Sequence, residues 1–216
     1  MAQCHDQFIA KFKRNRGPQK GTIDGWRVAA IDGVELFSST SRSCSQCLTR
    51  KNKKDETEYF HSAVLLQKVG GDPPVIYGVE HLKPRDGAEK DEGEITGAIR
   101  LLKDTAKRHG RLIDIVTADA LYAKASFIHT VLDLGMDAVV RMKEERRLIM
   151  KDARGLFDHR PADVQWTEKD DNGNSVEVKA WDEEGFTSWE QIRVPIRMVK
   201  MIRQTEKTNI VGGKKQ

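Results

Sequence analysis

The stretch VAAIDG at residues 28–33 is a short apolar run that ends in an aspartate, and it decides the fold. A continuous apolar run bounded by turn residues is typical of a strand buried on both faces of a sheet. A second run of this kind, LIDIVTA at residues 112–118, ends in Asp119. If the two strands are parallel neighbours, Asp32 and Asp119 meet at the edge where ligands of open α/β sheets bind.

The segments around these two runs predict an α/β fold with one mixed sheet. Strands at 59–69 and 75–79 follow the first run through polar and glycine-containing connections, which favours an antiparallel meander, and 38–58 reads as a long polar loop. The chain then predicts a helix, the second run, a helix and a strand, at 94–109, 112–118, 124–134 and 137–142. Three antiparallel strands followed by parallel strands, with helices on the faces, is the order of the ribonuclease H-like fold.

The character of the sequence changes after residue 145. The length of 216 residues suits one domain with an insertion. Here a short helix is expected at 148–157 and strands at 164–168, 175–182 and 192–203, with Trp166, Trp181 and Trp189 as anchors of a small core. We therefore expect a basic N-terminal linker, a ribonuclease H-like core, a β-rich insertion and a basic tail, at 1–24, 25–145, 146–204 and 205–216.

The two aspartates predict a site for a divalent cation. Two carboxylates held close together repel each other, and a cation between them removes that cost. Hard oxygen ligands select Mg²⁺ or Mn²⁺, and such ions promote phosphoryl transfer. Taken singly, each aspartate has another explanation as a turn former or helix N-cap. Glu94 is either a third carboxylate of the site or a charge that favours the helix dipole.

The sequence resembles the DDE transposases of bacterial insertion sequences, of the insertion-sequence-four type. The resemblance covers roughly residues 25–203 and lies in three stretches: AAIDGVELFSS around Asp32, EGEITGAIRLLK around Glu94, and IVTADALYAKASFIHTVLDLGMDAVVRMK at 115–143. Within the third stretch, Asp119-x-x-Tyr122 is similar to the second-aspartate motif of the family. Tyr122 itself either positions DNA or packs in the core.

The resemblance implies a transposase catalytic domain. Asp32 and Asp119 would be the first two catalytic acids and would bind Mg²⁺, while water or a DNA 3′-hydroxyl attacks a phosphodiester at a transposon end. The implied partners are transposon-end and target DNA, bound by a homodimer in the bacterial cytoplasm, at the nucleoid and away from any membrane. The alternatives are a DNA-binding remnant without catalysis and an unrelated ribonuclease H-like nuclease.

The third acid of the family departs from its pattern here. The resemblance places it as a glutamate on a helix after the strand insertion, within a Tyr/Arg/Glu/Lys pattern. Glu206 is followed by only ten residues, and Gly212-Gly213 disfavour a helix. We therefore do not assign Glu206 to the triad, and we expect the chain to be truncated before its third carboxylate and poorly active alone.

Charge and cysteine content leave two further questions open. Net charge is +4, with basic residues concentrated in 1–20 and 193–216, which fits either a polyanionic partner or solvated tails. The loop residues Arg42, Arg50, Lys51, Lys53 and Lys54 fit phosphate contacts or a solvated loop equally. Cys44 and Cys47 have zinc-like spacing with His61 downstream, but no fourth ligand is evident, so free loop thiols are the preferred interpretation.

Overall fold

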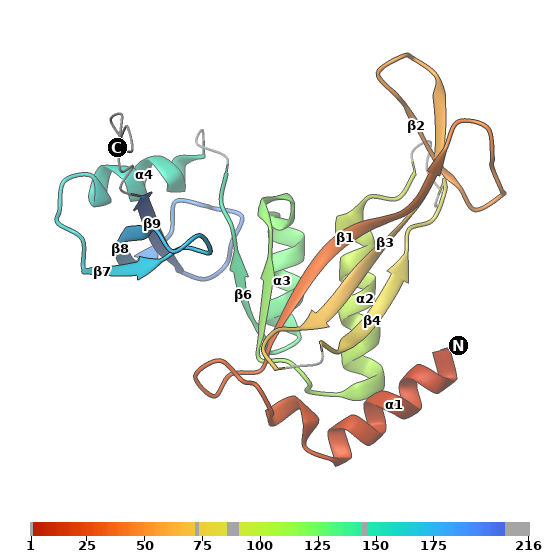
Figure 1. Cartoon of the computed structure of the whole chain (residues 1–216), viewed down its shortest axis with the longest axis horizontal. Coiled ribbons are helices and arrows are strands. Elements are labelled where there is room, and N and C mark those ends of the chain that lie inside the picture. Colours follow the sequence, from red (N-terminus) through yellow and green to blue (C-terminus); the bar gives the residue numbers. More distant parts are fainter. Residues whose placement is uncertain (1, 72–73, 86–90, 144–146, 206–216) are drawn as a thin grey trace, which may run out of the picture. The chain divides into compact units, whose positions relative to one another are not determined.

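The computed structural model describes residues 2–71, 74–85, 91–143 and 147–205 (Figure 1). The chain forms two compact units, Met1–Lys143 and Glu144–Gln216. Among the residues that the structure describes, no helix is long and apolar enough to cross a membrane.

The first unit is built on a six-stranded mixed sheet. Its strands run in the order β2-β3-β1-β5-β6, and β4 also pairs with β3. The strands are β1 Val28–Ser39, β2 Leu48–Lys51, β3 Thr57–Lys68, β4 Ile76–His81, β5 Ile115–Ala118 and β6 Asp137–Val140. Strand β3 is antiparallel to β1, β2 and β4, whereas β1, β5 and β6 are parallel. This topology confirms the predicted ribonuclease H-like fold.

Helix α2, Glu94–His109, packs on β3, β4 and helix α3, Ala125–Asp133 (Figure 1). The helix begins with an acidic residue, has basic residues in its last turn and ends at Gly110, as the sequence predicts. Its buried face includes Ala98, Leu101 and Leu102, each at most 1% exposed. These side chains share one apolar core with residues of the central strands and α3, namely Ile31, Val64, Leu66, Val116, Phe127 and Val131.

Two parts of the first unit differ from the prediction. The first strand does not end at Asp32, because β1 continues to Ser39 in its ladder with β3. The polar segment 38–58 contains strand β2, which pairs with the start of β3. Leu48, at the start of β2, is 1% exposed, so one buried apolar side chain anchors a strand that is otherwise polar.

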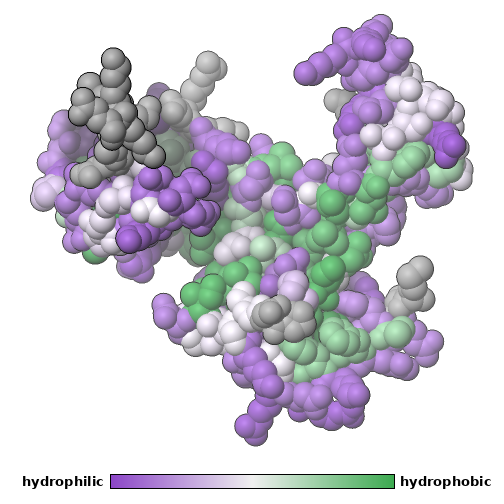
Figure 2. Space-filling model, viewed as in Figure 1, coloured by the Kyte–Doolittle hydropathy of each residue, from purple (hydrophilic) through white to green (hydrophobic). Residues whose placement is uncertain are grey.

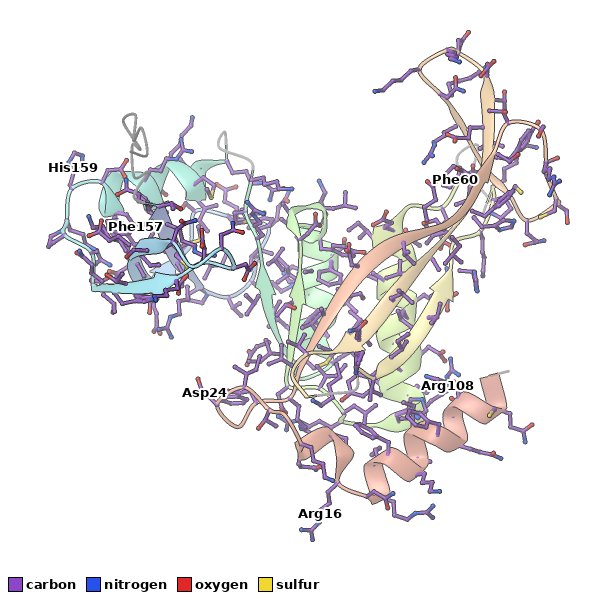
Figure 3. All side chains as sticks on the ribbon, viewed as in Figure 1. Arg16, Asp24, Phe60, Arg108, Phe157 and His159 are labelled. Atoms are coloured by element: carbon purple, nitrogen blue, oxygen red, sulfur yellow. The ribbon has the colours of Figure 1, made fainter. Side chains whose placement is uncertain are left out.

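The expected N-terminal linker contains a packed helix, α1, Ala2–Arg14. Ile9 is fully buried, and the ring of Phe12 lies 6.5 Å from that of Tyr77. Arg108 of α2 faces this helix and pairs with Asp6 at 3.2 Å (Figure 3). The basic composition of the segment obscured the amphipathic spacing that makes it a helix.

The second unit combines helix α4, Leu148–Phe157, with a three-stranded antiparallel sheet in the order β7-β8-β9. The strands are β7 Val164–Lys169, β8 Ser175–Phe186 and β9 Ile196–Thr205. Trp181 and Trp189 are buried as predicted, but Trp166 is 37% exposed and is not a core anchor. Phe157 of α4 packs edge-on against Phe186 of β8, with ring centroids 6.2 Å apart (Figure 3).

An ion pair joins the beginnings of β1 and β5. The backbone N–H and the Nε of Arg27 donate to Asp114 Oδ2 at 3.0 and 2.8 Å, and its Nη2 donates to Oδ1 at 2.5 Å. The hydrogen bonds from Arg27 lower the pKa of Asp114 from 3.8 to about 2, although burial opposes the shift. The pair therefore holds the first residues of the two parallel strands level with each other.

We expect Asp114→Asn to lower the free energy of unfolding by about 2 kcal/mol at neutral pH, since charged hydrogen bonds are lost. A carboxylate with a lowered pKa stabilises the fold above its unfolded-state pKa, and this stability is lost as pH falls through the folded-state value. The difference from wild type should therefore shrink between about pH 4 and pH 2. Urea unfolding across pH measures it. Asp133→Asn, an exposed change at the end of α3, is the control, and an equal loss there would contradict the argument.

Candidate active site

The register of β1 and β5 places Asp32 and Asp119 level with each other. The parallel pairing runs from Val28 opposite Ile115 to Ile31 opposite Ala118. Asp32 and Asp119 are the next residues on the two chains, and neighbouring strands lie about 4.8 Å apart. Both aspartates are exposed. Two carboxylates separated by 87 positions in sequence thus come from adjacent backbone positions.

Each aspartate also has a local role. Asp32 Oδ1 accepts the N–H of Gly33 at 2.9 Å, while the backbone of Asp32 continues in the strand opposite Leu65. Asp119 is the N-cap of the short 3-10 helix η2, Ala120–Tyr122, and its Oδ1 accepts the N–H of Leu121 at 2.8 Å. The capping alternative for Asp119 is therefore present in the structure. It fixes the carboxylate through one oxygen.

Glu94, in the first turn of α2, brings a third carboxylate to this edge of the sheet. Tyr122 donates its hydroxyl to Glu94 Oε2 at 3.4 Å. A Cβ atom added to Gly33 would overlap the Glu94 carboxyl group. The absence of a side chain at the residue after Asp32 therefore leaves the space that Glu94 occupies.

The charges of these groups act on one another. Burial raises the pKa of Glu94 above its ordinary value, and the negative charges of Asp32 and Asp119 raise it further. The hydrogen bond from Tyr122 acts in the opposite direction. Burial and the same three carboxylates raise the pKa of Tyr122, which is fully buried and packs against Phe127 with centroids 5.1 Å apart. Tyr122 is thus a core residue whose hydroxyl holds Glu94 in place.

The chemistry of this donor set fits Mg²⁺ or Mn²⁺. All three side chains offer hard oxygen atoms, and their mutual repulsion is what a divalent cation relieves. They are not a compact cage. In the described ranges, only Cys44, Cys47 and His61 form a group of three whose ligand atoms all lie within 4.8 Å of one another. Mg²⁺ is commonly held by one or two carboxylates with several waters, so a wider spacing suits it.

The structure changes the interpretation of the basic loop and leaves Glu206 aside. Arg50 is engaged within the protein, because it pairs with Glu35 at 2.6 Å and Glu58 at 2.7 Å. Its guanidinium also lies 4.6 Å from the ring centre of Phe60. Arg50 is therefore not free for a phosphate contact as it stands. Glu206 lies outside the described residues.

No protein-family model matches the sequence, and neither does any curated protein. Among solved structures, the chain is similar to the piggyBac transposase in a synaptic complex with hairpin DNA. The sequences are 12% identical with a TM-score of 0.37, and the match covers 71% of this chain and 30% of that one. This chain thus spans less than a third of the length of the transposase, and residue roles are drawn from the geometry alone.

Glu94→Gln should stabilise the protein at neutral pH without divalent cations, by about 0.5–2 kcal/mol. An acid whose pKa is raised in the folded state destabilises that state once it ionises. The gain should therefore appear as pH rises above the ordinary glutamate value of 4.5 and vanish below it. Thermal unfolding at several pH values measures it. The exposed Glu190→Gln serves as control, and a Glu94→Gln protein less stable than wild type at pH 7 would contradict the assignment.

Proposed function

We propose that the first unit is a catalytic region for metal-dependent phosphoryl transfer on DNA, of the DDE transposase kind. The observation that carries the proposal is the β1–β5 register, which brings Asp32 level with Asp119 beside Glu94. The ribonuclease H-like strand order and the resemblance in the stretches around these three residues support it. The insertion-sequence-four type and a homodimer on transposon-end and target DNA belong to the same proposal.

In this proposal Asp32 and Asp119 bind the metal, and Glu94 assists from α2. Mg²⁺, when bound, makes an attacking oxygen more nucleophilic and stabilises negative charge on the leaving oxygen. The protein supplies the positions of the carboxylates. The β1–β5 register sets Asp32 and Asp119, the η2 cap orients Asp119, and the Tyr122 hydroxyl orients Glu94.

Mg²⁺ should raise the unfolding temperature of the wild-type chain and support nicking of supercoiled plasmid DNA. Asp32→Asn and Asp119→Asn should remove the Mg²⁺-dependent rise and lower nicking by about 100-fold or more, since each removes a carboxylate from a charge-stabilising site. Asp137→Asn, at the exposed start of β6, is the matched control and should behave as wild type.

The outcomes separate the candidate functions. Nicking that depends on Asp32 and Asp119 but proceeds equally on RNA would favour an unrelated nuclease. Salt-sensitive DNA binding with a Mg²⁺ effect but no nicking would favour a DNA-binding protein without catalysis. A wild-type chain that neither responds to Mg²⁺ nor nicks DNA would overturn the proposal.

Gly33→Ala tests the part played by Glu94. The added methyl group would displace a flexible carboxyl side chain rather than backbone, so the fold should survive while Glu94 leaves its place near Asp32. We expect the Mg²⁺-dependent rise in unfolding temperature to diminish. Gly93→Ala is the matched control, because a Cβ there meets no atom within 4 Å. Equal responses of the two variants to Mg²⁺ would exclude Glu94 from the site.

A further inference from the structure

Two cysteines and a histidine converge at the outer end of the first unit. Cys44 and Cys47 lie in the connection between β1 and β2, and His61 lies on β3. The two sulfur atoms are 3.6 Å apart, and His61 Nε2 lies 3.3 Å from Cys44 Sγ and 3.4 Å from Cys47 Sγ. The three ligand atoms thus form a nearly equilateral triangle.

We propose that Cys44, Cys47 and His61 bind a zinc ion. Bond lengths of about 2.3 Å to sulfur and 2.0–2.1 Å to nitrogen, in a tetrahedron, place the ligand atoms roughly 3.5–3.8 Å apart. The observed separations of 3.3–3.6 Å match one face of such a tetrahedron. Two thiolates and an imidazole are soft and borderline ligands that select Zn²⁺ over Mg²⁺. The sulfur separation is far from the roughly 2.05 Å of a disulfide, and both cysteines are free.

The surrounding backbone holds this geometry. The N–H of Cys47 donates to the carbonyl of Cys44 at 3.2 Å, which closes a turn, and the N–H of Cys44 donates to Cys47 Sγ at 3.2 Å. His61 faces Phe37 in the β1–β3 ladder, with ring centroids 6.2 Å apart. Cys47 is 7% exposed and precedes the buried Leu48. Cys44 is exposed, so the ion has a protein side and a side open to a water or another ligand.

The ion has a structural role in this proposal. It links the polar connection after β1 directly to β3, in a region where few apolar side chains are available to fix the chain. Figure 2 shows hydrophilic side chains gathered around β2. Arg42, Lys53 and Lys54, all exposed, lie in the segments on either side of that strand. Zinc therefore fixes the path of a basic segment at the tip of the sheet.

Metal analysis of the whole purified chain tests the proposal. Protein prepared without chelators should contain about one Zn²⁺ per chain, and a mercurial reagent that blocks thiols should release it to a chromogenic dye. Cys44→Ser, Cys47→Ser and His61→Gln should each lose the zinc. Cys4→Ser is the matched control, because Cys4 is an exposed cysteine of α1, and it should retain zinc. Asp32→Asn should also retain it, since the site is independent of the carboxylates.

A second measurement covers variants that fold poorly. Wild-type protein reconstituted with Co²⁺ should show the visible absorption of a tetrahedral site and a thiolate-to-cobalt charge-transfer band, and the exposed Cys44→Ser variant should lose intensity in that band. Reduced protein that contains no zinc and takes up neither metal would overturn the proposal. So would stoichiometric zinc in Cys44→Ser, or a Cys44–Cys47 disulfide in protein that remains free of metal after reduction.

Discussion

The ion pair between Arg27 and Asp114 sets the geometry on which the candidate active site depends. It joins the residue before β1 to the residue before β5 through three hydrogen bonds. Four paired positions further along, the same register delivers Asp32 and Asp119 side by side. A slip of one residue would turn the side chains of one strand to the other face and separate the two carboxylates. A contact at one end of the parallel pair thus determines the chemistry that is available at the other.

The sequence predicts the helices and the parallel part of the sheet well, because their signals are local. The apolar stripe and charged ends of α2 define its bounds, and the runs that end at Ile31 and Ala118 are strands buried in the core. Helix α1 and strand β2 were missed because few apolar residues hold each of them, and tertiary contacts at Ile9 and Leu48 decide their structure. Local pattern alone does not contain such contacts.

The same distinction holds for the candidate sites. Asp32 and Asp119 could be paired from strand order alone, since the ends of parallel strands meet. The space above Gly33 that admits Glu94 depends on how α2 packs on the sheet, and the sequence does not reveal it. His61 joins Cys44 and Cys47 only through the β1–β3 ladder, which places it opposite Phe37 and next to the turn. A spacing rule that expects ligands in two tight pairs does not find this combination.

Strand β1 does more than carry Asp32, because it continues for seven residues beyond it to Ser39. At about 3.3 Å per residue, this extension reaches roughly 23 Å from the carboxylates. A duplex rises about 3.4 Å per base pair, so DNA lying along the strand from the carboxylates to the tip would cover roughly seven base pairs. The length of one strand therefore sets a footprint: phosphates held at the outer end of the sheet would fix which bond, about two-thirds of a helical turn away, reaches the carboxylates.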